Sequence, residues 1–162
     1  VRFVHAGAEA IPAPDASFDI VLMLKSLHHV PLPLMDSALS EVARVLKPGG
    51  LAWISEPVYA GDMNALLSLF HDEKIVREAA FAAVSRAVEQ GPLTLDRQIF
   101  FQTRSKFDDF AHFEQRMIRV THLDHVLSPE LYAAVKARFE SFMTPEGVTF
   151  RPPQRVDLLV KR

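Results

Sequence analysis

Two short apolar runs separated by a helical segment constrain the fold of this chain more than any other feature of its sequence. The first run, Phe18–Leu24, reads FDIVLML, and the second covers Leu51–Ser55. Continuous apolar runs of this length are typical of strands that are buried on both faces of a parallel sheet. Between the two runs, apolar residues recur at helical spacing at Leu39, Val42, Ala43 and Leu46. A strand, a helix and a strand in this order predict an α/β fold, with helices packed on the faces of a mostly parallel sheet.

Further local signals extend this pattern along the chain. Asp36 is placed to cap the helix between the two runs, and Lys47-Pro48-Gly49-Gly50 is expected to end it. The other predicted elements are a strand tail at 2–4, a helical segment over 62–90 that divides near His71-Asp72, a short strand at 98–103, a short helix at 106–113, a strand at 114–122, a helix at 129–142 capped by Ser128, and a closing strand at 155–161. We expect a single domain, in which residues 62–91 form a helical insertion that either packs on the sheet or covers a substrate.

The composition excludes several classes of protein. With 18 basic and 20 acidic residues the formal net charge is -2, so no global field draws the chain onto nucleic acid or an anionic membrane. The absence of cysteine excludes disulfides and thiolate metal sites. No apolar run approaches the length of about 20 residues that a transmembrane helix requires, so a cytoplasmic location is expected. The chain begins at Val1 without a methionine, from which we expect that an upstream segment has been removed.

Sequence pieces over residues 3–57 carry a specific pattern. They are Ala8–Pro12, Asp15–Val21, Leu27–Val30, Glu41–Gly50 and Ile54–Pro57. In this order and spacing they resemble the class I S-adenosylmethionine-dependent methyltransferases that act on small molecules. The resemblance implies a doubly wound, Rossmann-like sheet with a final antiparallel strand, S-adenosylmethionine as the cofactor, and methyl transfer to a small-molecule acceptor.

The resemblance also implies that this chain is a C-terminal, truncated portion of such a domain. The family's glycine-rich cofactor loop and the acidic residue that follows its second strand have no counterpart here, because both precede the third strand. The alternative is an inactive module derived from a methyltransferase, which acts by association. Phe18–Leu24 would then lose a neighbouring strand, so we expect a homodimer or another association through that exposed edge. An oxidoreductase on a related sheet is disfavoured by the same pieces.

Five residues take the places of the family's cofactor contacts. In relatives, the turn after the third strand offers an acid and a backbone amide to the adenine, and these places fall on Gly7 and Ala8. Glu9 follows in the same turn and is either a further contact or a surface carboxylate. Leu24 and Lys25, at the carboxyl end of the fourth family strand, are expected to face the cofactor crevice.

Three residues are candidates for chemistry. His28 or His29 is placed to act as a general base toward an oxygen or nitrogen nucleophile, or else only to pack and hydrogen-bond the start of the next helix. Glu56 either orients a hydroxyl or amine of the acceptor, or hydrogen-bonds neighbouring backbone. Methyl transfer from a sulfonium depends mainly on in-line alignment, so such assistance is optional. No metal site is expected at His122, Asp124 and His125, because neighbouring side chains of an extended segment point apart.

Overall fold

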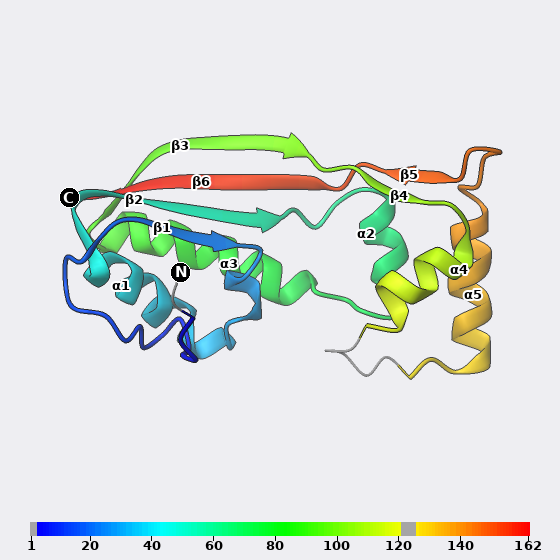
Figure 1. Ribbon diagram of the computed structural model, residues 1–162, viewed down its shortest axis with the longest axis horizontal. Coiled ribbons are helices and arrows are strands. Elements are labelled where there is room, and N and C mark those ends of the chain that lie inside the picture. Colours follow the sequence, from blue (N-terminus) through cyan, green and yellow to red (C-terminus); the bar gives the residue numbers. More distant parts are fainter. Residues whose placement is uncertain (1–2, 121–125) are drawn as a thin grey trace. The chain divides into compact units, whose positions relative to one another are not determined.

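The computed structural model describes residues 3–120 and 126–162, which form two compact units (Figure 1). The first unit contains the chain up to Val58, together with Lys74–Phe101 and Gln154–Arg162. The second unit contains Tyr59–Glu73 and Gln102–Pro153.

A four-stranded sheet is the frame of the first unit, in the order β1-β2-β6-β3. Its strands are β1 (Phe18–Leu24), β2 (Leu46–Pro57), β3 (Leu93–Gln102) and β6 (Pro153–Lys161). Strand β2 pairs parallel with β1 and antiparallel with β6. The register places Leu24 beside Ser55, so β1 ends level with the last residues of β2. The predicted α/β fold with an antiparallel last strand is confirmed.

Two helices, α1 (Met35–Val45) and α3 (Lys74–Gln90), pack against each other and share one core with the sheet (Figure 1). The short turns η1 (Leu27–His29) and η2 (Leu32–Leu34) join β1 to α1. The core is built from Met23, Leu39, Val42, Ala52, Ile54, Ala80, Val84 and Leu159, among others. The alternating burial along the strands assigns every second residue of β1 and β2 to the side of this core.

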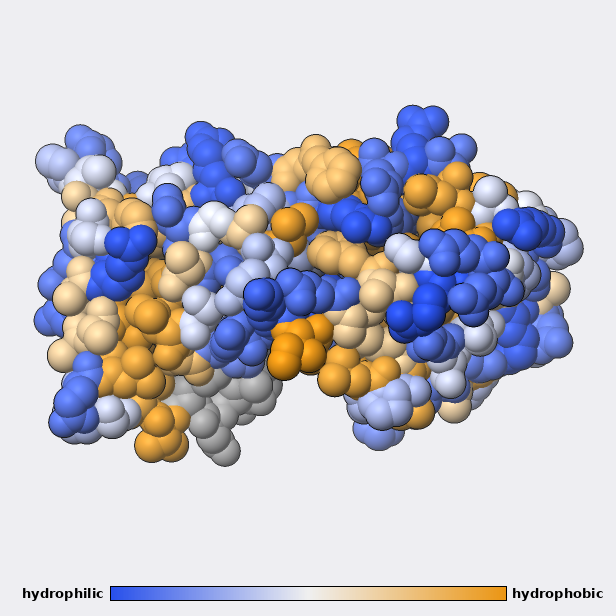
Figure 2. Space-filling view, turned by 180° about the vertical axis from the view of Figure 1, so that it is seen from behind, coloured by the Kyte–Doolittle hydropathy of each residue, from blue (hydrophilic) through white to orange (hydrophobic). Residues whose placement is uncertain are grey.

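The other face of β1 is uncovered, so the prediction that this strand is buried on both faces is wrong. Ile20, Leu22 and Leu24 are 57%, 60% and 61% exposed, whereas Met23 is buried. Within the described part of the chain β1 pairs only with β2, and residues 3–7, which include part of the predicted strand tail, form no regular element. Figure 2 shows that hydrophobic areas also lie between hydrophilic ones on the opposite face of the molecule from the one seen in Figure 1. The apolar run thus marks a strand, but one at the edge of its sheet.

The start of α1 and the start of β2 also differ from the prediction. Leu34 is the N-cap residue of α1, and Asp36 lies in the first turn, where its carboxylate pairs with Arg86 of α3 at 2.8 Å. Strand β2 begins directly after the helix, and a shift of register between Phe18 and Ile20 accommodates the extra residues of β2. Gly49, with φ +76°, provides the left-handed backbone that such a bulge requires.

The second unit is organised around an aromatic core. Its elements are α2 (Asp62–Leu67), β4 (Ser105–Phe107), α4 (Phe110–Phe113), the π-helix η3 (Glu114–Ile118), α5 (Pro129–Glu140) and β5 (Val148–Phe150). Strands β4 and β5 pair antiparallel. Phe107, Phe113 and Phe139 are buried, and the ring centroids of Phe113 and Phe139 lie 4.9 Å apart. Offset and edge-on ring contacts of this kind add to the free energy gained by burying the rings.

Several predicted elements of the later half of the chain are confirmed and two are wrong. The helical segment divides as expected into α2 and α3, and Ser128 Oγ caps α5 by accepting from Leu131 N at 3.2 Å. The apolar residues of these two helices enter different cores, since Leu66 of α2 belongs to the aromatic core and Val84 of α3 to the core of the first unit. The predicted helix at 106–113 forms only from Phe110, because 105–107 pair as β4, and the strand predicted from residue 114 is a π-helix over 114–118.

Candidate functional site

A buried carboxylate organises the turn that follows β1. Glu56, near the end of β2, is 1% exposed. Its Oε1 accepts hydrogen bonds from the backbone N–H of Ser26 at 3.1 Å and of Leu27 at 2.8 Å, and its Oε2 pairs with Nδ1 of His28. One side chain therefore fixes three groups of the turn, at the end of the sheet where β1 stops. Of the two alternatives for Glu56, the contact with neighbouring backbone is the one that the structure contains.

The chain leaves β1 in an uncommon conformation. Lys25 has φ +54°, a left-handed value that few residues other than glycine adopt. Its N–H donates to the carbonyl of Ser55 at 2.7 Å, which extends the pairing of β1 and β2 by one residue. Leu24 and Lys25 both present exposed side chains at this strand end. Their position agrees with the general rule that ligands of α/β sheets bind beside the carboxyl ends of strands.

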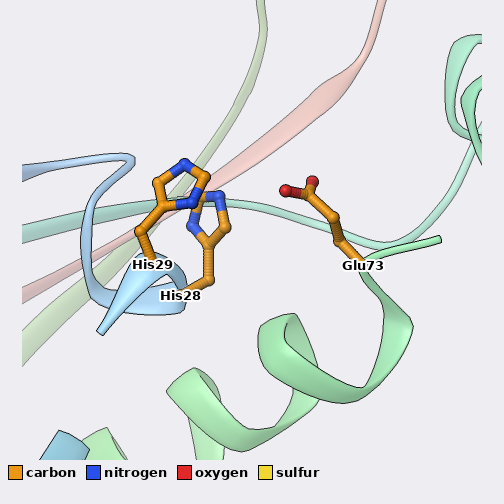
Figure 3. Close-up of side chains that lie close together, drawn as sticks. All are labelled: His28, His29 and Glu73. Atoms are coloured by element: carbon orange, nitrogen blue, oxygen red, sulfur yellow. The ribbon is translucent and has the colours of Figure 1, made fainter. Parts of the chain in front are cut away.

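Figure 3 shows the two histidines of the turn side by side. The ring of His28 is buried, and its centroid lies 4.1 Å from that of His29 at an angle of 40° between the planes. The side chain of His29 is exposed. Because Nδ1 of His28 faces the carboxylate, a neutral His28 that donates from Nδ1 carries its acceptor position on Nε2. The turn thus presents one oriented imidazole beneath one exposed imidazole.

In the turn at residues 7–10, which is expected to contact the adenine, the carboxylate of Glu9 lies beside Gly7. The N–H of Ala10 donates to the carbonyl of Gly7 at 3.2 Å, and Ala8 packs against the core of the first unit. A Cβ added at Gly7 would lie only 2.2 Å from Oε1 of Glu9. The carboxylate of Glu9 therefore occupies the space where a side chain of residue 7 would begin. An acid is absent from the sequence at residue 7, but a carboxylate is present beside it.

Two charged residues of α1 hold the loop that leads into β1. The guanidinium of Arg44 donates to the carbonyls of Ile11 and Ala13 at 2.9 and 2.8 Å, and to Asp15 at 2.7 Å. It also donates to Glu41 at 2.6 Å, while Glu41 accepts from the N–H of Ile11 at 2.9 Å. These hydrogen bonds, chiefly those from Arg44, lower the pKa of Glu41 from 4.5 to about 2. Glu41 and Arg44 both lie in the Glu41–Gly50 piece of the family pattern, but the sequence alone assigned no role to their side chains.

This loop clamp gives a pH-dependent prediction for Arg44→Gln. A carboxyl whose pKa is lower in the folded state than in the unfolded state stabilises the fold above the unfolded value. The contribution of Glu41 is therefore complete above pH 4.5 and is lost as the pH falls toward about 2. We expect the melting temperature of Arg44→Gln to depend less on pH in this window than that of the wild type. Differential scanning calorimetry measures it, with Arg97→Gln, an exposed arginine, as the control; an unchanged pH profile in Arg44→Gln would contradict the clamp.

The structure does not test the prediction that the cluster near residue 122 holds no metal. His122, Asp124 and His125 lie outside the described residues. No helix in the described part of the chain combines the length and the apolar character needed to cross a membrane.

Comparison with known proteins finds similarity to methyltransferases in the first third of the chain. Residues 1–54 match a family model described as a methyltransferase domain. The ubiquinone/menaquinone biosynthesis C-methyltransferase UbiE of Azotobacter vinelandii is 40% identical over 72 residues, which are 44% of this chain and 27% of that protein. The 27-O-demethylrifamycin SV methyltransferase of Amycolatopsis mediterranei is 50% identical over 50 residues, 31% of this chain and 18% of the relative. The chain thus spans less than a third of the curated relatives that it matches.

Solved structures extend the similarity to the whole fold. The YcgJ protein of Bacillus subtilis superposes with a TM-score of 0.65 at 20% identity, covering 99% of this chain and 71% of that one. A putative methyltransferase of Bacillus halodurans gives a TM-score of 0.63 at 19% identity, covering 99% and 78%. At these identities the structural similarity shows the fold alone. The similarity in sequence to methyltransferases is confined to residues 1–54 in the family model.

Proposed function

We propose that this chain, which is by family resemblance a class I S-adenosylmethionine-dependent methyltransferase, takes part in transferring the methyl group of that cofactor to a small-molecule acceptor. The observation that carries the proposal is the ordered turn at the ends of β1 and β2. Its backbone lies within residues 1–54, which match the methyltransferase model, and Glu56, which holds it, follows directly after them. The names of both relatives reported above describe enzymes that methylate small molecules, which supports the same class of acceptor.

Residues of the turn at 7–10 and of the end of β1 suit part of the cofactor. The carboxylate of Glu9, folded over Gly7, is suited to accept from an adenine amine, and the N–H of Ala8 is suited to bond the adenine ring. Leu24 and Lys25 would border the crevice at the strand end. When bound, S-adenosylmethionine supplies an activated methyl group on a sulfonium. None of the chain's glycines forms a counterpart of the family's glycine-rich loop, so these residues account for the nucleoside end alone.

We assign different roles to the three polar residues of the turn. His29 is exposed and is the group that would accept a proton from a hydroxyl or amine of the acceptor. His28 and Glu56 are buried and act as positioning residues, because their pairing orients the ring on which His29 lies. Alignment of the acceptor with the methyl group contributes most of the rate, so loss of His29 should lower kcat by about a hundredfold, the low end of what a general base contributes.

Binding of S-adenosylhomocysteine to this chain tests the proposal. We expect saturable binding in isothermal titration calorimetry, and about tenfold weaker binding of Glu9→Gln, because the amide loses a charge-assisted acceptor for the adenine amine. Glu89→Gln, which changes an exposed carboxylate of α3, serves as the control and should bind as the wild type does. No heat above background for the wild-type chain would overturn cofactor binding by these residues.

An inactive module that acts by association is the second candidate. The exposed apolar face of β1 favours it, as does the outer side of this strand, which no strand of the described residues pairs with, since such an edge invites pairing with another strand. A second copy of the chain is the proposed partner, with the two β1 strands adjoining about a two-fold axis.

A further inference from the structure

Two arginines, Arg104 and Arg151, lie at the end of the ribbon formed by β4 and β5, one position beyond its paired residues. The register of the two strands pairs Ser105 with Phe150, and the N–H of Thr103 donates to the carbonyl of Pro152 at 3.2 Å. Arg104 and Arg151 are therefore directly opposite each other between these two pairs. Side chains that lie directly opposite each other in an antiparallel pair are close neighbours. Like charges in such a position destabilise the ribbon.

In the described part of the chain, the two arginines are not paired with a carboxylate. Neither arginine makes a hydrogen bond or an ion pair within the described residues, and both side chains are exposed. Lys106 lies two residues along the strand from Arg104 and so projects from the same face of the ribbon. Its ammonium is 3.8 Å from a carboxylate oxygen of Asp108, too far for a close charge-assisted hydrogen bond. Within this part of the chain, Arg104 and Arg151 therefore add two unpaired positive charges to this face of the ribbon, beside the ion pair of Lys106 with Asp108.

These cations line a groove within the second unit. The groove has a volume of about 620 Å³, and its lining includes Arg104, Lys106 and Arg151. Asp62 and Glu146 also line it, and among the described residues neither carboxylate forms an ion pair with Arg104 or Arg151. Two hydroxyl groups, of Thr144 and Thr149, add further polar atoms to the same lining.

Apolar side chains complete the lining of the groove. Met63, Phe142, Val148 and Phe150 contribute to it, and the last two are buried members of the aromatic core. The lining thus combines an apolar part with charged and hydroxyl groups, which suits an organic molecule that carries both an apolar and a charged part. Two adjacent guanidinium groups match a carboxylate particularly well, because each offers paired N–H donors.

We propose that this groove binds a small organic anion, a carboxylate joined to an apolar body, whose charged group lies between Arg104 and Arg151. The apolar body packs against Met63 and Phe142. All of these residues belong to the second unit, so the proposal stands on its own and does not rest on methyl transfer by the first unit.

Titration of the full chain with octanoate tests this site. We expect saturable binding that weakens with salt, with acetate and 1-octanol binding at least about tenfold more weakly, since each lacks one half of the recognised chemistry. Arg104→Gln and Arg151→Gln should each reduce the affinity for octanoate about tenfold, the value expected for losing a hydrogen bond to a charged group. Arg97→Gln, an exposed arginine of β3, is the matched control and should leave the affinity unchanged.

Thermal melting of the same variants separates binding from a structural role. Removing one of two opposed like charges should leave the melting temperature unchanged or raise it slightly. A clear fall in the melting temperature of Arg104→Gln or Arg151→Gln would mean that the arginines hold the ribbon together, which would overturn the proposal. The absence of saturable octanoate binding, equal binding of 1-octanol, equal binding of acetate, or an equal loss in Arg97→Gln would overturn it as well.

Discussion

Replacing Glu56 with leucine is expected to lower the free energy of unfolding by about 3–5 kcal/mol. Leucine fills a similar space but accepts no hydrogen bond, so the N–H groups of Ser26 and Leu27 and the ring of His28 lose their shared partner inside the protein. A buried donor without an acceptor costs its full desolvation penalty, which is why the effect exceeds the net worth of any one bond. Urea denaturation followed by circular dichroism measures the change.

Two companion variants identify the cause of that loss. Glu56→Gln keeps an oxygen that can accept from both N–H groups, and we expect it to cost about 1–2 kcal/mol, less than the leucine variant. Glu89→Leu makes the same change at an exposed site and should stay within about 0.5 kcal/mol of the wild type. A loss below about 1 kcal/mol for Glu56→Leu would show that the carboxylate does not hold the turn.

The edge of β1 gives the second large effect. If two chains associate through this strand, Ile20→Lys should weaken the association about a hundredfold, because it removes a buried apolar contact and places a charge at the interface. The side chain of Ile20 is 57% exposed in the single chain, so the substitution should change its folding little. Sedimentation velocity over a range of concentrations measures the association.

A matched control tests whether position, and not hydrophobicity alone, decides the result. Ile75 in α3 is 71% exposed and lies away from β1 in the sequence, so Ile75→Lys should leave the association intact. A wild-type chain that remains monomeric at every concentration, or an equal effect of the two substitutions, would rule out the edge of β1 as the interface.

The elements set by local chemistry could be predicted from the sequence. The bounds of β1 follow from one apolar run, and the start of α5 follows from Ser128, whose hydroxyl is placed to cap the first turn. The exposure of Ile20 could not be predicted, since an apolar run reports the preference of the strand itself and not whether a neighbouring strand or helix is present to cover it. The π-helix at 114–118 also departs from local preference, which alone suggested an extended segment there.

The candidate site depended on contacts between residues far apart in the chain. Glu56 was identified as a candidate, but its contact with Leu27 joins residues 29 positions apart, so local patterns left its role open. Glu41 and Arg44 stood in a recognised motif, and only the folded structure revealed that Arg44 bonds the carbonyl of Ile11. The opposition of Arg104 and Arg151 likewise follows from the register of two strands, which the sequence does not specify.

The sharing of one carboxylate by three groups has a consequence for motion. The bonds of Glu56 to Ser26, Leu27 and His28 break together when the turn moves away, so partial opening gives up nearly as much energy as complete opening. That end of the sheet should therefore open as one cooperative segment instead of fraying residue by residue. The ring of His29, which rests on His28, is then either fully in place or fully displaced, with few intermediate positions.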